Sequence, residues 1–155
     1  MKKVFRFVII VLSFWTFSSL AQAQEVRLGF SIGAGLKFGG ASAYPVPALP
    51  QVILEVQVLE PLWVRLQIAP YLLVDEITLD LKYCFFNASN TPYIGVGAGI
   101  GLYFMAGLAP VLHASVGYQI DLSNSTRFFT ELFVDPLDAV VDPQLKLMAG
   151  LTFRL

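Results

Sequence analysis

The chain is predicted to be an all-β protein, an eight-stranded antiparallel up-and-down transmembrane β-barrel preceded by a cleavable signal peptide. Residues 144–155 alternate between apolar and polar side chains, the period-two pattern of a strand with two different environments. The hydrophobic fraction is 56% and the mean hydropathy is +0.68. After residue 23, however, no apolar run approaches the ~18 residues of a membrane-spanning helix. Apolar content spread over alternating segments is typical of a membrane barrel, which is apolar outside and polar inside.

The first 23 residues have the three parts of a secretory signal peptide. Two lysines and an arginine form a positive start, an apolar stretch covers residues 7–15, and Ala21-Gln22-Ala23 matches a cleavage site. The apolar stretch is shorter than the ~20 residues that cross a bilayer as a helix, which disfavours a membrane anchor. We therefore expect export and a mature chain of residues 24–155, a suitable length for one barrel domain.

Four alternating segments are expected in the first half of the mature chain. Residues 26–38 place large apolar side chains on one face, with arginine, lysine, serine and glycine on the other. Residues 39–50 contain three prolines, which cannot donate to a strand ladder, so we expect a loop there and not a central strand. The next three expected strands are residues 51–59, 62–72 and 77–86.

The fifth expected strand, residues 93–104, carries a column of glycines on its polar face at Gly95, Gly97, Gly99 and Gly101. Glycine in a strand marks close approach or bending, so the column is expected to make room for large neighbours or to leave a cavity. The candidate neighbours are Trp63, Tyr71, Tyr103, Phe129 and Phe133. The G-x-G-x-x-G spacing of a nucleotide loop is absent. The last three expected strands are residues 111–122, 127–134 and 144–155.

An even number of strands puts both ends of the barrel wall on one side of the membrane, taken as periplasmic. The turns at residues 60–61, 87–92 and 123–126 then face the periplasm. The connections at residues 39–50, 74–76, 105–110 and 135–143 face outward from the cell. Five aromatic residues fall on the apolar face near the periplasmic end and predict an aromatic girdle there: Tyr83, Phe85, Tyr118, Phe128 and Phe153.

Three segments carry a family resemblance: TPYIGVGAGIGLYF at residues 91–104, VGYQIDLSNSTRFFTEL at residues 116–132, and the terminal AGLTFRL. They resemble the small outer-membrane β-barrels of the OmpA/OmpX type. The resemblance implies a barrel in the outer membrane of a Gram-negative-type bacterium, in contact with lipid and lipopolysaccharide and inserted by the barrel-assembly machinery. It implies no single function. The family usually ends on an aromatic residue, whereas this chain ends on Leu155, with Phe153 two residues before it.

The predicted inner face carries charges of both signs in similar number. Burying an unpaired ion is costly, and eight strands leave an interior just wide enough for side chains to fill. We therefore expect a plug of ion pairs and hydrogen bonds in the lumen, and the alternative is a narrow pore for small solutes. The predicted network comprises Arg27, Glu55, Arg65, Asp80, Lys82, His113, Glu131, Lys146 and Arg154.

One arrangement of polar residues points to catalysis. His113 and Ser115 share a strand face, and Glu131 lies on the next strand, which is the set of groups needed for an activated nucleophile. The outer-membrane lipid A deacylases are eight-stranded barrels with a His-x-Ser arrangement and a glutamate, but here Val116 replaces their following asparagine. The pattern also turns both residues inward, away from lipid. We therefore expect no enzyme and assign these residues to the interior network.

The composition also excludes several classes of site. One histidine and one cysteine, Cys84, cannot make a metal cluster, and neither metal nor cofactor is expected. A net charge of −1 gives no indication of nucleic-acid binding. A non-catalytic role in envelope integrity or surface interaction is favoured over a pore, a lipid-modifying enzyme and a soluble lipocalin-like barrel. A lipocalin would place its apolar face inside, yet the opposite face mixes charges with glycine. Oligomeric state and any specific ligand are left open.

Overall fold

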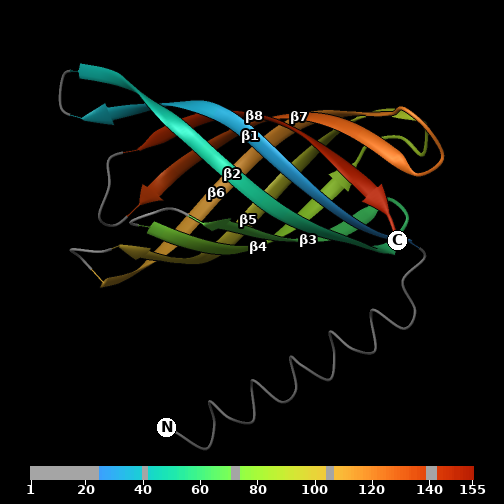
Figure 1. Cartoon of the computed structure of the whole chain (residues 1–155), viewed down its shortest axis with the longest axis horizontal. Helices are drawn as coiled ribbons and strands as arrows, with labels where there is room; N and C mark the ends of the chain where they lie inside the picture. The colour runs from blue at the N-terminus through green and yellow to red at the C-terminus, as the bar shows by residue number, and fades with distance from the viewer. Residues whose placement is uncertain (1–24, 40–41, 71–73, 104–106, 139–142) are drawn as a thin grey trace, which may run out of the picture.

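The computed structural model describes residues 25–39, 42–70, 74–103, 107–138 and 143–155, which form one closed barrel of eight antiparallel strands (Figure 1). Each strand pairs with the next along the chain, and β8 pairs back to β1, which confirms the predicted topology. The strands are β1 (Glu25–Gly39), β2 (Ser42–Leu59), β3 (Leu62–Pro70), β4 (Val74–Cys84), β5 (Asn90–Tyr103), β6 (Gly107–Asp121), β7 (Thr126–Asp138) and β8 (Gln144–Arg154). The predicted signal peptide lies outside the described residues.

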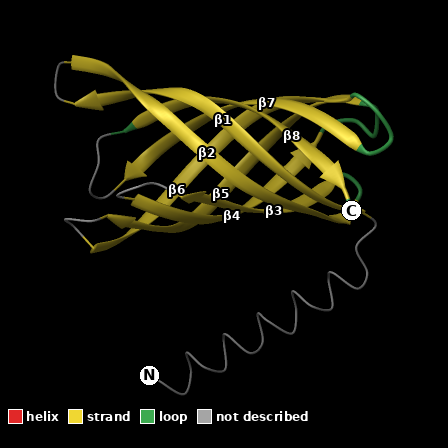
Figure 2. Ribbon diagram, viewed as in Figure 1, coloured by secondary structure: helices red, strands yellow, loops and turns green. Residues whose placement is uncertain are grey.

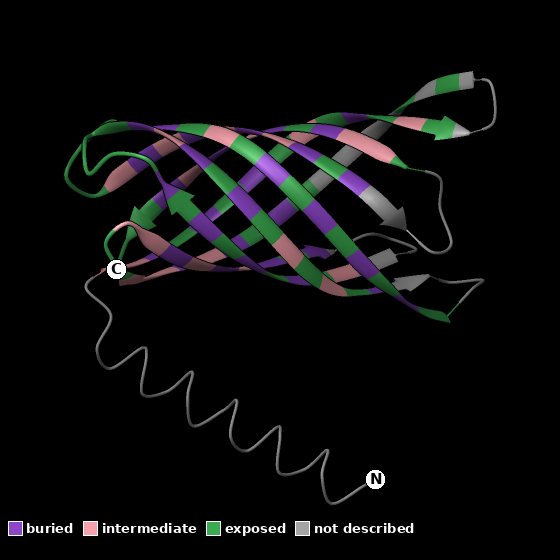
Figure 3. Ribbon diagram, turned by 180° about the vertical axis from the view of Figure 1, so that it is seen from behind, coloured by how far each residue is buried: buried purple, intermediate pink, exposed green. Residues whose placement is uncertain are grey.

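Burial alternates along the strands, with exposed and buried residues following one another around the wall (Figure 3). The outward positions hold large apolar side chains such as Phe30, Leu79 and Val96. The inward positions hold arginine, lysine, glutamate, histidine, threonine and glutamine. A soluble ligand-binding barrel has the opposite arrangement, so the lipocalin alternative does not fit this fold. No helix among the described residues is long and apolar enough to cross a membrane.

The proline-rich segment predicted to be a loop is instead the first half of β2. Residues 42–48 pair with β1, whereas the pairing of β2 with β3 ends at Val52 opposite Ile68 in the described part of the chain. A strand with one neighbour needs donors on one side only, which is where proline is tolerated. Pro50 also lies next to a register shift between β1 and β2, and bulges are the other place where strands accept proline.

Two of the other three connections at this end are shorter than the sequence predicted, because β6 already begins at Gly107 and β7 runs to Asp138. The connection predicted at residues 74–76 is shifted instead, since β3 ends at Pro70 and β4 begins at Val74. Pro136 misled the prediction for β7, since it lies at a register shift between β6 and β7. At the opposite end, three short turns join the strands near the C-terminus (Figure 2). The turn between β4 and β5 covers residues 85–89, and not residues 87–92 as predicted.

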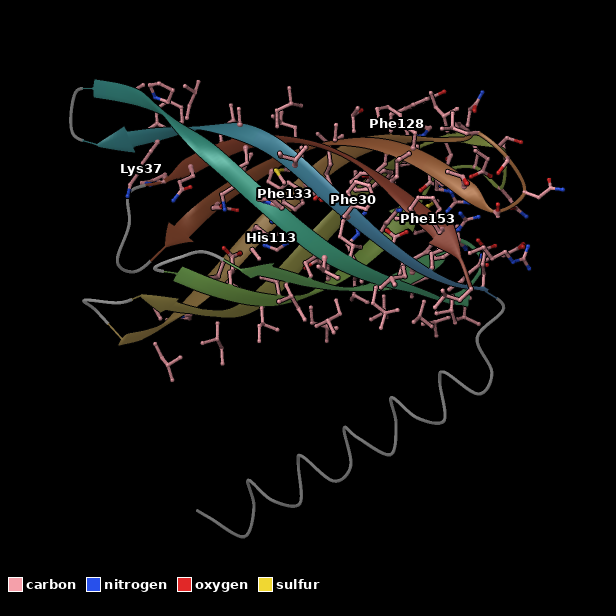
Figure 4. All side chains as sticks on the ribbon, viewed as in Figure 1. Phe30, Lys37, His113, Phe128, Phe133 and Phe153 are labelled. Atoms are coloured by element: carbon pink, nitrogen blue, oxygen red, sulfur yellow. The ribbon has the colours of Figure 1, made fainter. Side chains whose placement is uncertain are left out.

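The five aromatic residues of the predicted girdle lie on the outer surface near the C-terminal end of the barrel. Phe128 is half-buried and the other four are exposed, and Figure 4 places Phe128 and Phe153 toward that end. The rings of Tyr83 and Phe85 meet edge to face, with their centroids 5.6 Å apart. The rings of Tyr83 and Tyr118, which are apolar but carry a polar hydroxyl group, suit the boundary between lipid and water.

Candidate functional site

Four charged side chains meet in the centre of the barrel and balance one another. Arg65 Nε donates to Glu55 Oε1 at 2.8 Å, and Lys82 Nζ donates to the same oxygen at 2.8 Å. Arg65 Nη1 also pairs with Glu131 Oε2. These side chains are 1–2% exposed. Because β3 and β7 are four strands apart in a ring of eight, the pair between Arg65 and Glu131 crosses the lumen from one wall to the opposite wall.

We call the four charged residues Glu55, Arg65, Lys82 and Glu131 the central cluster. Aromatic rings surround them. The Arg65 guanidinium carbon lies 5.6 Å from the ring centroid of Tyr93 and 5.5 Å from that of Phe129. Lys82 Nζ lies 4.4 Å from the Tyr93 ring centroid, within the range of a cation–π contact. Room for these rings comes from glycines on other strands than β5. A Cβ at Gly117 would overlap the Tyr93 ring, and one at Gly150 would lie 2.6 Å from Phe129 Cζ.

In the glycine column of β5, Gly97 makes room for a polar pair. The atoms nearest to a Cβ at Gly95, Gly97 or Gly99 do not belong to Trp63, Phe129 or Phe133, three of the neighbours that the sequence suggested. Gly97 lies directly between Asp80 and His113 in the two ladders. His113 Nε2 lies 3.0 Å from Asp80 Oδ1, and Gln67 donates to the other oxygen of that carboxylate. A Cβ at Gly97 would overlap both the Asp80 carboxylate and the His113 ring. The side chains of Tyr71 and Tyr103 lie outside the described part of the structure.

Adding one methyl group at this position tests that interpretation. We expect Gly97→Ala to destabilise the barrel by about 1–3 kcal/mol, since overpacking a filled interior forces its neighbours off their rotamers. Gly95→Ala is the matched control, because a Cβ there mainly meets the Ser115 hydroxyl, at 2.5 Å, which can rotate away. Urea unfolding of the two variants in detergent micelles measures the difference. Equal midpoints would show that the Asp80–His113 pair does not depend on Gly97.

Further ion pairs lie toward both ends of the lumen. At the end of the lumen away from the C-terminus, Lys146 Nζ is 2.7 Å from Asp135 Oδ2 and 3.9 Å from Glu76 Oε2. On the side of the C-terminus, Arg27 pairs with Glu25, and Arg127 Nε donates to Asp121 Oδ1 at 2.6 Å. Arg127 was not part of the predicted network, although it shares the alternation of Phe129 and Glu131 on β7.

The structure buries eight of the nine residues of the predicted network, and Arg154 is the exception. Arg154 is exposed because it is the last residue of β8 and lies at the rim of the barrel. The ion pairs described above distribute the eight buried residues over the lumen. Glu55, Arg65, Lys82 and Glu131 form the central cluster, Asp80 lies against His113, Lys146 pairs with Asp135, and Arg27 pairs with Glu25.

The groups required for an activated nucleophile have other partners. His113 faces Asp80, and its ring meets Phe133 edge to face with centroids 5.2 Å apart. The Glu131 carboxylate pairs with Arg65 and not with His113. Ser115 lies opposite Gly95 and Phe133 in the ladders. No cluster of three metal-ligating side chains occurs among the residues that the structure describes. The interior is thus built for mutual charge pairing.

No family model and no curated protein matches the chain. Among solved structures, Neisserial surface protein A aligns with a TM-score of 0.69 at 10% identity, covering 86% of this chain and 99% of that one. The chain has the fold of the eight-stranded outer-membrane barrels. The N-terminal β-barrel domain of Pseudomonas aeruginosa OprF aligns at 0.61 with 11% identity, over 86% of this chain and 99% of that one. The P. aeruginosa outer membrane protein OprG aligns at 0.54 with 12% identity, over 86% and 97%. These alignments confirm the barrel type that the sequence resembled.

Proposed function

We propose that the protein is an integral outer-membrane barrel with a non-catalytic, structural role in the cell envelope. The observation that carries this proposal is the ion pair between Arg65 and Glu131, two members of the central cluster that lie on opposite walls of the lumen. Together with Tyr93 and Phe129, the cluster fills the interior of a barrel that has little room to spare. A closed lumen supports an anchor or scaffold over a transport pathway.

The outer surface supports the membrane location. Its exposed leucine, isoleucine, valine and phenylalanine side chains suit lipid tails, and the aromatic residues near the C-terminal end suit the periplasmic boundary. In this orientation the hairpin of β1 and β2 extends toward the cell surface, where lipopolysaccharide and external partners are found. Insertion would be carried out by the barrel-assembly machinery.

Fractionation followed by electrophoresis tests the architecture and the location together. We expect the protein in the outer-membrane fraction, with a mobility that changes on boiling, because a folded barrel resists detergent until heated. Residues 24–155 refolded into planar bilayers are then expected to show no steady conductance. Recovery as a soluble periplasmic protein without a heat-dependent shift would contradict the membrane proposal. A stable single-channel conductance would instead support the narrow pore for small solutes.

Removal of the Ser115 hydroxyl tests the absence of catalysis. We expect Ser115→Ala to leave the lipid A mass profile of expressing cells unchanged, because His113 is engaged by Asp80 and Glu131 by Arg65. The matched comparison is the parent protein at equal outer-membrane abundance. A loss of deacylated lipid A in the variant alone would restore the enzyme hypothesis.

A further inference from the structure

A cavity of about 110 Å³ opens at the C-terminal end of the barrel, between the turn that joins β2 to β3 and the turn that joins β4 to β5. One wall is apolar and is formed by Trp63, Cys84 and Phe86. The polar wall includes Gln57, which is the ladder neighbour of Trp63, together with Gln119 and Arg127. The Arg127 guanidinium carbon lies 5.2 Å from the Trp63 ring centroid. This cavity, which we call the mouth cavity, contains no member of the central cluster.

Two buried polar atoms of the polar wall have no protein partner. Gln119 is 3% exposed, and its Oε1 accepts no hydrogen bond from the described residues. Arg127 is 6% exposed; Asp121 engages its Nε and Nη2, at 2.6 and 3.4 Å, and its Nη1 has no partner in the described structure. Buried polar groups are almost always hydrogen-bonded, to protein or to water. An unpaired acceptor and an unpaired donor lining one cavity therefore mark a place where a small polar group can bind.

The charges around the mouth cavity favour a neutral ligand. Arg127 is already balanced by Asp121, and Glu25 is balanced by Arg27. The third charged residue of the lining, Glu60, is exposed at the rim. A ligand with a full charge would upset that balance. A secondary amide is neutral and carries one donor and one acceptor side by side. Its N–H can donate to Gln119 Oε1 while its carbonyl oxygen accepts from Arg127 Nη1, and an attached methyl group can pack against Trp63.

We propose that the mouth cavity binds the acetamido group of an N-acetylated amino sugar. The cavity has the volume of about three or four waters, at ~30 Å³ each, which suits a short terminal substituent that enters from the mouth. An amide within a peptide chain continues into further residues on both sides, so it does not fit a cavity that accepts only a terminal group. The sugar ring would remain outside against the exposed rim, where Glu60 and Asn87 offer partners for hydroxyl groups. The source of the sugar, cell-wall glycan, rests on the proposed periplasmic orientation.

Titration of the purified, folded barrel with N-acetylglucosamine tests the proposal. Binding is followed by NMR in detergent micelles, at the Trp63 indole N–H and the side-chain amide of Gln119. We expect saturable shifts at both positions, and an affinity at least ~10-fold weaker for glucosamine, which lacks the carbonyl and the methyl group. Equal responses to the two sugars, or shifts confined to residues outside the mouth cavity, would overturn the proposal.

Two variants locate the binding. Gln119→Leu removes the unpaired acceptor and is expected to abolish the shift of the Trp63 indole. Ala88→Phe blocks the cavity from an exposed turn and is expected to do the same without changing the interior. Asn124→Ala, in the exposed turn between β6 and β7, is the control and should bind like the parent. Unchanged binding by folded Ala88→Phe would overturn the assignment. Because binding is measured on purified protein, its failure is separate from the failure of the outer-membrane location, which fractionation reports.

Discussion

Replacement of Arg65 with methionine is expected to destabilise the barrel by about 3–5 kcal/mol, the cost of breaking a buried ion pair from one side. Glu131 would lose its guanidinium partner across the lumen, while Glu55 would keep Lys82. The Glu131 carboxylate would then be buried without a counter-ion, at 1% exposure of its side chain. Urea unfolding of the refolded barrel in lipid vesicles, followed by tryptophan fluorescence, measures the loss.

The double variant Arg65→Met/Glu131→Met shows whether the loss of stability comes from the unpaired Glu131 carboxylate or from lost packing around Arg65. Removing both partners of a buried pair is often neutral or stabilising, so we expect the double variant to be more stable than Arg65→Met alone. Arg27→Met is the matched control at the mouth of the barrel, where the partner Glu25 is 16% exposed and water can replace the lost cation. A double variant less stable than the single one would show that packing around Arg65, and not its charge, stabilises the centre.

The sequence predicted which side chains point inward but not which of them meet. Alternation is a local property, so the inward direction of Glu55, Arg65 and Glu131 could be deduced strand by strand. Arg65 and Glu131 are 66 residues apart, and their contact depends on strand count and register around the whole ring. Strand count alone would have placed β3 opposite β7. The height of each residue on its strand follows from the ladders, which local periodicity does not encode.

The glycines show the same limit. Gly97, Gly117 and Gly150 each make room for a side chain on another strand. The sequence marked the β5 column as a site of close approach or a cavity, and at Gly97 the close neighbours are Asp80 and His113 and not aromatic rings. Proline misled the prediction in a different way. The rule that excludes proline from central strands holds only where a strand has neighbours on both sides. In the described part of the barrel, the first half of β2 pairs with β1 alone.

An arginine on the lipid-facing surface is expected to lower the free energy of unfolding substantially only at the membrane midplane. We expect Leu79→Arg, in the middle of β4, to destabilise the barrel by about 2–4 kcal/mol in lipid vesicles, because a charge at that depth must leave water. Leu59→Arg, at the end of β2 beside the turn to β3, should cost about 0–1 kcal/mol. The parent side chains are matched in exposed fraction, at 56% and 61%, so depth is the main difference between the two variants.

The contrast between these two arginines tests the membrane assignment without any reference to similar proteins. On the surface of a soluble barrel, both substitutions would fall within about 0.5 kcal/mol of the parent, since exposed positions away from special features tolerate charge. In a lipid-embedded barrel, only the substitution near the polar boundary is tolerated. Equal unfolding midpoints for the two variants in vesicles would therefore contradict the membrane location. A large loss for Leu79→Arg alone would show that the apolar face of β4 is in contact with lipid.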